Sequence, residues 1–503
     1  MDLSVLLFLL FSFAVWASFA LRSNSRPRNP SKLPLPPGPK PFPIIGNILE
    51  LGPNPHHSLT KLSKTYGPLI SLKLGTLTTV VASSPETARA VLQQYDHLCS
   101  NRSVPAAVHA LDHHKFGLAP SPVNDRWRRL RKICKEQMFS VSRLDSSQEL
   151  RREKLHQLMD YVQECSITGR ALDIGREAFT TSLNLIFASL FSVDFAVLYG
   201  SDSSQEIKDM VWKNTEASGK PNLADYFPFL RPVDPQGLLR RKTLIYKKFF
   251  EIFDGIIGQR LQSRRASGGP MSKNDMLEAL LDLNQKNESE LSFNEINHLL
   301  LDLFIAGTDT SSTTIEWVMT ELMSNPEKMV KVRNELLNVV GQNERVQEAD
   351  ISRIPYLQAV IKETFRLHPV VPFLLPHKAT EDIEINGRVI PQNAQVLVNV
   401  YAIGRDANLW PEPDRFVPER FLEQEINYHG RHFELIPFGS GRRICPGLPL
   451  AHRMVHLVIA SLIHNFDWKL EGEIQPGQID MSEKFGLTLQ KATPLKIIPL
   501  KLK

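Results

Sequence analysis

The longest uninterrupted helical pattern in the chain lies between Ser292 and Asn325. Ser292 and Glu295 form a capping box, in which each side chain can accept a hydrogen bond from the other residue's backbone N–H. The residues that follow are mostly apolar as far as Ile305, and Asn325-Pro326 ends the pattern. These signals predict a buried helix of about thirty residues, which only a large, mainly helical core can cover.

The middle of this predicted helix carries the unusual stretch AGTDTSSTT, from Ala306 to Thr314. A glycine and six β-hydroxylated residues disfavour a regular helix, and such a stretch is typical of a functional kink at which the backbone ladder opens or bulges. A buried Asp309 beside Thr310 could then relay protons into an apolar pocket. The alternative is a hydroxyl-rich helix face turned toward solvent.

Most of the remaining sequence also has helical periodicity. Short alternating apolar runs near Leu69–Val81 and Ile383–Val400 predict a few strands. The expected fold is therefore mainly α with a minor β part, in one large catalytic domain at residues 47–503. Hydrophobic residues at 42 % and charged residues at 22 % are ordinary for a globular protein. The net charge of +5 is mild, and no dense cationic run indicates nucleic-acid binding.

The amino-terminal segment Leu3–Leu21 contains no charged residue and is long enough to nearly span a bilayer core of ~30 Å. It is longer than the apolar region of a signal peptide, and Asp2 gives no cationic start, so residues 1–22 are predicted to be a retained transmembrane anchor. The cationic residues that follow place the body of the protein in the cytosol. They are Arg22, Arg26, Arg28 and Lys32. Residues 23–46, which are basic and rich in proline, are expected to form a stiff hinge.

Cysteine spacing narrows the chemistry of the stretch FGSGRRICPG, Phe438–Gly447. The four cysteines lie too far apart for a zinc quartet or a disulfide framework, which leaves a nucleophile or an iron ligand as roles for Cys445. The pattern after Gly447 predicts a helix, whose amino-terminal N–H groups favour a thiolate. The glycines, among them Gly439, leave room for a large flat ligand to approach the backbone.

A second candidate cluster joins Glu363, Arg366 and Arg420. Glu363 and Arg366 lie on one helix face, and Pro369 ends that helix. Taken alone, this is an ordinary surface pair worth a few tenths of a kcal/mol. The downstream sequence PERF, Pro418–Phe421, could bring Arg420 to the same carboxylate and form a buried three-member network.

These stretches together resemble the membrane-anchored cytochromes P-450, which are haem-thiolate monooxygenases, over essentially the whole chain. The family's cysteine signature matches at Phe438, Gly441, Arg443, Cys445 and Gly447. Its other motifs match at Glu363 and Arg366 (ExxR), Pro418–Phe421 (PERF), Ala306–Thr310 (AGxDT), Trp127 and Arg131 (WxxxR), and Pro36–Pro39 (PPGP). The resemblance implies the cytochrome P-450 fold, and a single-pass location in the endoplasmic reticulum membrane with the catalytic domain in the cytosol.

By this resemblance the cofactor is haem b, and Cys445 is the axial ligand of its iron. Asp309 and Thr310 would deliver protons, while Glu363, Arg366 and Arg420 would hold the core around the haem. His377 stands where many relatives have a propionate-binding arginine, so the charge at this contact is expected to depend on pH. The expected haem contacts are Trp127, Arg131, Ala306, His377, Phe438, Gly439, Arg443 and Gly447. Electrons would come from NADPH through NADPH–cytochrome P-450 reductase, and the substrates would be O2 and a hydrophobic small molecule.

Three further stretches resemble the plant terpenoid-oxidising group that includes geraniol 8-hydroxylase and ferruginol synthase. They are Gly219–Gly237, Tyr356–Pro369 and Ile479–Ala492. The expected substrate is a terpenoid or terpenol hydroxylated at an unactivated C–H, in a pocket lined mainly by apolar residues. The expected pocket residues are Val104, Phe116, Phe227, Phe229, Ile305, Ala306, Val371, Phe373, Leu374, Phe485 and Leu487.

Other functions stay open at this point. A sister group in the same branch hydroxylates tyrosine, and two more distant alternatives are a reductase-independent haem-thiolate isomerase or dehydratase and a non-catalytic haem sensor. The paired histidines His56-His57 and His113-His114 could suggest metal ligands. We interpret them as loop surface, because no carboxylate or cysteine lies at ligand spacing in the sequence.

Overall fold

The computed structural model describes residues 33–195, 203–267, 275–286, 291–342, 344–472 and 474–502. The predicted membrane anchor, residues 1–22, and the first part of the predicted hinge lie outside these ranges. None of the helices within them combines the length and the hydropathy that a membrane crossing needs. The described residues confirm a mainly α protein with a minor β part.

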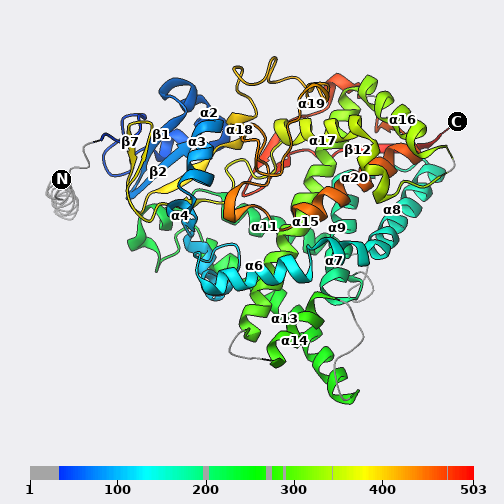
Figure 1. The fold of residues 1–503 in the computed structure, drawn as a ribbon, viewed down its shortest axis with the longest axis horizontal. Helices are drawn as coiled ribbons and strands as arrows, with labels where there is room; N and C mark the ends of the chain where they lie inside the picture. The colour runs from blue at the N-terminus through cyan, green and yellow to red at the C-terminus, as the bar shows by residue number, and fades with distance from the viewer. Residues whose placement is uncertain are drawn as a thin grey trace, which may run out of the picture.

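Helices make up most of the described chain (Figure 1). The helices of the amino-terminal half are α2 (Pro55–Tyr66), α3 (Pro85–Arg89), α4 (Asp96–Cys99), α5 (His113–Phe116), α6 (Asp125–Gln137), α7 (Val141–Ser146), α8 (Gln148–Thr168), α9 (Ile174–Phe191), α11 (Ser203–Gly219) and α12 (Leu223–Tyr226). Those of the carboxy-terminal half are α13 (Leu238–Ala266), α14 (Met276–Lys286), α15 (Phe293–Ser324), α16 (Pro326–Val340), α17 (Pro355–Leu367), α18 (Val400–Ile403), α19 (Arg420–Glu423) and α20 (Leu448–Asn465).

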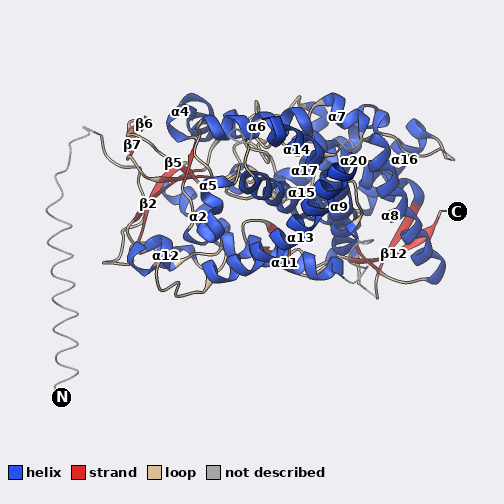
Figure 2. Cartoon of the chain, turned by 90° about the horizontal axis from the view of Figure 1, so that it is seen from below, coloured by secondary structure: helices blue, strands red, loops and turns tan. Residues whose placement is uncertain are grey.

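The strands form small sheets that lie mainly at one end of the molecule (Figure 2). The largest sheet has the order β1-β2-β8-β5-β3, and β12 pairs with β4 and β9 at the opposite end. Both stretches predicted to hold strands do so. The strands are β1 (Leu69–Leu74), β2 (Leu77–Ala82), β3 (Asn101–Arg102), β4 (Leu172–Asp173), β5 (His377–Lys378), β6 (Ile383–Ile385), β7 (Arg388–Ile390), β8 (Gln395–Val398), β9 (Phe466–Leu470), β10 (Glu483–Phe485), β11 (Leu489–Lys491) and β12 (Lys496–Lys501).

Helix α15 runs through the helical part of the molecule and packs against α9 and α20 (Figure 1). Its capping box is present as predicted, because Ser292 Oγ accepts from the Glu295 N–H while Ser292 N–H donates 2.8 Å to Glu295 Oε2. The helix ends at Ser324, as the Asn325-Pro326 signal predicts. Its buried residues belong to the main hydrophobic core.

The predicted opening or bulge in the middle of α15 is absent, since Phe293–Ser324 is one continuous α-helix. The hydroxyl groups bond to the preceding turn, as expected, without breaking the ladder: Thr310 Oγ1 donates 2.7 Å to Ala306 O, and Thr314 Oγ1 donates 2.9 Å to Thr310 O. Gly307 serves packing instead, because a Cβ there would lie 2.8 Å from Ile186 Cδ1 of α9. The alternative of a solvent-facing hydroxyl face is wrong, since Thr308 is fully buried and Ser312 nearly so.

Candidate active site

A cavity of about 400 Å³ lies between α15 and the chain that precedes α20. Cys445 lines it from the α20 side, and Ala306, Asp309 and Thr310 of α15 line it too. Two distant sequence motifs therefore meet across one space. Most of the residues expected to contact the cofactor also line this cavity, namely Trp127, Arg131, His377, Phe438, Gly439 and Arg443.

Cys445 is positioned by the backbone on both sides of it. Its N–H donates 2.9 Å to Phe438 O, and α20 begins three residues later with Gly447 as the N-cap. Burial raises the pKa of the Cys445 thiol, while the N–H groups of Gly447 and Leu448 and the charge of Arg131 act to lower it. The helix start and the arginine thus favour a thiolate in a place that otherwise opposes charge.

The glycines of this stretch were predicted to leave room for a flat ligand, but in the structure they have different roles. Gly441 has φ +65°, and a Cβ there would lie 2.1 Å from Leu92 O, so close backbone packing requires glycine. Gly447 caps α20 and is not among the residues that line the cavity. Only Gly439 borders the open space.

Three buried or half-buried arginines gather on one side of the cavity. Arg443 donates 2.8 Å to Ser100 O, Arg131 donates to Ile444 O, and Arg102 donates 2.7 Å to Leu375 O. Burial and then the charges of Arg443 and Arg131 lower the pKa of Arg102, and its Nε has no hydrogen-bond partner within the described residues. None of the three forms an ion pair with a carboxylate in the described part of the chain.

This cluster fits a ligand with two carboxylates. Uncompensated cations inside a protein are costly, and an anionic group that accepts charge-assisted hydrogen bonds removes the cost. The Trp127 ring lies beneath the same cations, 5.6 Å from Arg131 and 4.5 Å from Arg443. Asn124 at the start of α6 holds Trp127 in place by accepting its N–H at 2.9 Å. A buried thiol, a mostly apolar cavity and arginines without carboxylate partners fit a haem, whose iron takes a thiolate and whose two propionates need cations.

His377 does not behave as the sequence suggested. It is 3 % exposed, and its Nδ1 lies 2.8 Å from Cys99 O. Burial, followed by the charge of Arg102, lowers the pKa of His377 to about 3, so the ring is neutral at physiological pH rather than pH-dependent. Arg102 lies directly opposite His377 in the β3–β5 pair and brings the missing guanidinium to the cavity. No motif contains Arg102, and only the strand pairing reveals it.

The acid–alcohol pair of α15 has partners that the sequence did not show. Asp309 is buried, and its carboxylate accepts from Thr488 Oγ1 at 2.7 Å and from Gln490 Nε2 at 2.5 Å. Burial raises the pKa of Asp309, and these two hydrogen bonds act to lower it. The Asp309 carboxylate is therefore held in a fixed position beside the cavity, with the Thr310 hydroxyl on the next residue.

The predicted three-member network is present and buried. Arg366 Nε and Nη2 each donate 2.7 Å to the Glu363 carboxylate, and Arg420 Nε donates 3.1 Å to Glu363 Oε1. The other donors of Arg366 reach the carbonyls of Gly404, Pro413 and Arg415. Glu363 and Arg366 thus tie α17 to the loop that precedes α19, and the surface-pair alternative is wrong.

The residues predicted to line an apolar pocket are divided among several places in the structure. Val104, Ile305, Ala306, Val371, Leu374 and Leu487 line the main cavity. The five predicted phenylalanines do not. Phe116 stacks on His298 with ring centres 5.4 Å apart, Phe227 lies against Gly75, and Phe229 is 67 % exposed.

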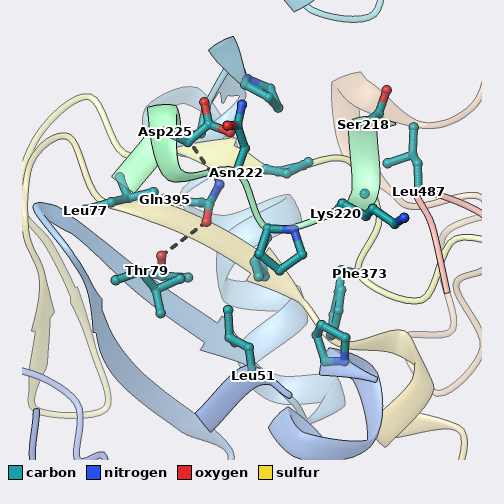
Figure 3. Close-up of a pocket in the computed structure, with 18 of the residues that line it drawn as sticks. Leu51, Leu77, Thr79, Ser218, Lys220, Asn222, Asp225, Phe373, Gln395 and Leu487 are labelled. Carbon is teal, nitrogen blue, oxygen red and sulfur yellow. Dashed lines mark hydrogen bonds between the residues drawn. The ribbon is translucent and has the colours of Figure 1, made fainter. Parts of the chain in front are cut away.

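Phe373 and Phe485 line a second cavity of about 190 Å³, shown in Figure 3. This cavity lies next to β2 and β8, where Thr79 Oγ1 donates 3.1 Å to Gln395 Oε1. Leu374 and Leu487 line both cavities, so the two spaces adjoin.

The loop-surface prediction is wrong for His56 and His113, which are buried in helices, whereas the His57 side chain is 53 % exposed, although it lies in α2. His56 is fully buried in α2, and its Nε2 lies 2.9 Å from Glu483 Oε2, while His57 Nε2 lies 3.3 Å from the same oxygen. These three residues have ligand atoms close enough to hold a metal ion. The carboxylate that the sequence seemed to lack comes from a strand more than four hundred positions away. His113 is also buried and lies 3.1 Å from Asp302.

Comparison with known proteins agrees with this arrangement. The family model "Cytochrome P450" matches residues 36–497. The chain is 57 % identical over 502 residues to Cytochrome P450 76T24 of Catharanthus roseus, covering 100 % of each chain. It is 48 % identical to ferruginol synthase of Salvia miltiorrhiza, covering 97 % of each, and 49 % identical to geraniol 8-hydroxylase of Catharanthus roseus, covering 99 % of each. The chain therefore belongs to the cytochrome P450 family.

Proposed function

We propose that this cytochrome P450 hydroxylates a hydrophobic terpenoid or terpenol, and that the motif residues act as the family resemblance implies. The observation that carries the proposal is one cavity bordered by a buried thiol, three cations without carboxylate partners and an acid–alcohol pair. Cytochromes P450 are haem enzymes that insert one oxygen atom from O2, using electrons that a reductase takes from NADPH.

In this proposal the Cys445 thiolate would bind the haem iron. Arg102, Arg131 and Arg443 would hold the propionates by charge-assisted hydrogen bonds, and the Trp127 ring packs against Arg131 and Arg443. Neutral His377 contributes shape rather than charge. Phe438, Gly439 and Ala306 line the cavity and would border the ring, and Gly447 would act indirectly by capping α20.

Asp309 and Thr310 move protons in this proposal. The Thr310 hydroxyl donates its hydrogen bond to Ala306 O, so its oxygen can accept a hydrogen bond from a water or another donor in the cavity. Thr488 and Gln490 hold the neighbouring Asp309 carboxylate through both of its oxygens. The pair can therefore hand protons to one side of the cavity while the apolar lining excludes bulk water.

The apolar lining supports a hydrophobic substrate. Ile305, Val371 and Leu487 offer area rather than directional contacts, and burial of apolar area contributes about 25 cal/mol per Å². Relatives at 48 % and 49 % identity are a ferruginol synthase and a geraniol 8-hydroxylase. These names favour a terpenoid over tyrosine.

We propose further that residues 1–22 anchor the protein in the endoplasmic reticulum membrane, with the hinge at 23–46 and the catalytic domain at 47–503 in the cytosol. The uncharged run Leu3–Leu21 and the cationic residues after it support this topology. Protease protection of a tag at each terminus in intact microsomes tests it, since a lumenal carboxyl end would overturn it.

The catalytic proposal is tested with microsomes that contain the full chain, a plant reductase, NADPH and a panel of mono-, sesqui- and diterpenes beside tyrosine. Oxygenated terpenoid products that require both reductase and O2 are expected. Product without reductase would indicate an isomerase or dehydratase, and no product with any compound would indicate a sensor. Preference for tyrosine would overturn the substrate class. Cys445→Ser is the matched control, and it should lose the 450 nm band of the reduced CO complex.

A further inference from the structure

One end of the main cavity is polar, although the rest of its wall is mostly apolar. The α11 residues Asn214, Thr215 and Ser218 line this end, together with Lys242 and Tyr246 of α13, His113 of α5 and Asp302 of α15. Asn214 and Ser218 lie one helical turn apart on the same face of α11, and Ser218 Oγ donates 2.8 Å to Asn214 O. No motif of the family resemblance includes these residues.

Lys242 is the cation of this polar end, and it is nearly unexposed at 2 %. Its Nζ donates 2.6 Å to Ser218 Oγ and lies 5.4 Å from the centre of the Tyr246 ring. It forms no ion pair with a carboxylate within the described residues. An ammonium has three N–H donors, so a buried one with a single hydroxyl acceptor can still donate to a ligand. Burial lowers the pKa of Lys242 to about 7, against the charge of Asp302.

Asn214 offers the complementary function. Its side chain is 4 % exposed and lines the cavity, and its Oδ1 has no hydrogen-bond donor within the described residues. A buried polar atom without a partner costs about 1–3 kcal/mol, which a ligand that donates a hydrogen bond would recover. Lys242 of α13 and Asn214 of α11 therefore bring a donor and an acceptor to the same cavity, and Ser218, which bonds to both residues, lies between them.

The carboxylate at this end is already occupied. Asp302 accepts from His113 Nε2 at 3.1 Å and from the N–H groups of Leu118 at 2.6 Å and Ala119 at 3.1 Å. It has little capacity left for a ligand ammonium. An amino-acid substrate would therefore find a cation for its carboxylate but no anion for its amine.

We propose that Lys242 and Asn214 bind the hydroxyl group of a terpenoid alcohol at this end of the cavity. A neutral hydroxyl accepts from Nζ and donates to Oδ1, whereas a carboxylate cannot donate and a hydrocarbon can do neither. Asp302 lies eight residues before Thr310 on α15, which is about 12 Å along the helix. The charge of Asp302 acts on Lys242, so the proposal puts the bound hydroxyl at the Asp302 end of the cavity and the oxidised carbon nearer Thr310. This inference rests on the proposed terpenoid hydroxylase function.

The test uses the haem-loaded full chain and the shift of its Soret band on binding. The probes are an acyclic ten-carbon terpene alcohol and the hydrocarbon, carboxylic acid and amine of the same skeleton. The wild type should bind the alcohol at least about tenfold more tightly than the hydrocarbon. Lys242→Met and Asn214→Leu should each bring that ratio close to one and change hydrocarbon binding by less than about twofold. Lys247→Met, on the exposed face of α13, is the matched control and should keep the wild-type ratio.

Equal affinity of the wild type for the alcohol and the hydrocarbon would overturn the inference. An alcohol-to-hydrocarbon affinity ratio that stays the same in Lys242→Met would do so too. Tighter binding of the acid or the amine than of the alcohol is the third outcome that would overturn it. The wild-type comparison decides the matter even if a variant fails to fold, which its reduced CO spectrum reports. Failure of the proposed function is distinguishable, because the wild type would then oxidise no probe with reductase and NADPH. Failure of this inference alone would leave alcohol and hydrocarbon oxidised equally well.

Discussion

The guanidinium carbon of Arg443 lies 4.5 Å from the centre of the Trp127 ring. Trp127 also lies beneath Arg131, so one indole supports two of the three cations beside Cys445. A cation held over an aromatic face in a desolvated site is stabilised by about 2 kcal/mol. The ring therefore preorganises the proposed propionate contacts.

Replacing Trp127 with leucine should speed haem loss. The change removes the support of Arg131 and Arg443, and a loss of about 1–2 kcal/mol corresponds to a rate increase of roughly tenfold. Transfer of haem to apomyoglobin, followed by absorbance, measures this rate. Trp212→Leu is the control. The Trp212 ring has a similar contact with Lys484, whose Nζ lies 4.2 Å from the ring centre, but neither residue lines the cavity that Cys445 borders. This variant should leave the rate of haem loss unchanged. An unaltered rate in Trp127→Leu would show that the ring does not support the cations.

Replacing Gln490 with leucine should move the acid limb of turnover to higher pH. Burial raises the pKa of Asp309, and the hydrogen bond from Gln490 opposes this effect. Without that bond the pKa of Asp309 rises further, so more of the carboxylate is protonated on the acid side of the profile. Product formed per NADPH should therefore fall as the pH is lowered, at a higher pH than in the wild type, and recover as the pH is raised. The exposed variant Gln392→Leu should keep the wild-type profile. A uniform loss at all pH values would instead indicate a general packing defect.

Glu363→Gln should destabilise the fold strongly. The substitution leaves the fully buried Arg366 without its charged partner and weakens the contact with Arg420, and an unpaired buried charge costs about 3–5 kcal/mol. Urea unfolding followed by tryptophan fluorescence gives the free-energy change. Glu412→Gln removes only the exposed pair with Arg415 and should leave the unfolding midpoint close to that of the wild type. Similar midpoints for the two variants would contradict the structural role of the network.

Glu316→Gln should stabilise the protein at pH 8 and have little effect near pH 4.5. Burial raises the pKa of Glu316 to about 7, against the hydrogen bond from the Leu495 N–H. The folded state then binds a proton that the unfolded state has released between pH 4.5 and 7, so the wild type loses stability as pH rises through this window. Glutamine keeps the oxygen that accepts from the Leu495 N–H but carries no charge. The free energy of unfolding at pH 8 should therefore rise by at most about 3 kcal/mol. Thermal unfolding at both pH values measures it, and equal shifts at the two pH values would refute the assignment.

The sequence could indicate those site residues whose type and spacing along the chain already limit their chemical role. Cys445 with its arginine and glycines and the Asp309–Thr310 pair each limit the possible roles, and the Glu363–Arg366 spacing does so once the PERF sequence adds Arg420. The capping box likewise fixed where α15 begins, since both partners are local. These features depend on neighbours within a few turns.

Arg102, Lys242 and Gln490 could not be predicted, because each acquires its role from a distant segment. Arg102 reaches the cavity through the pairing of β3 with β5, and Gln490 meets Asp309 across 181 positions of the chain. The phenylalanines were misplaced for a related reason. Hydrophobicity indicates that Phe227 and Phe229 can be buried, but their loop presents Phe229 to solvent and packs Phe227 beside β1.

Ser218 lines both cavities, and its hydroxyl accepts the hydrogen bond of Lys242. The proposed anchor for the alcohol therefore lies at the boundary between the smaller and the larger space. A molecule that passes from the first into the second leads with its hydrocarbon tail and docks its hydroxyl last. Oxidation then adds a second polar group to the hydrocarbon tail, which entered first. The product therefore carries its new polar group at the end that lies deepest in the larger cavity.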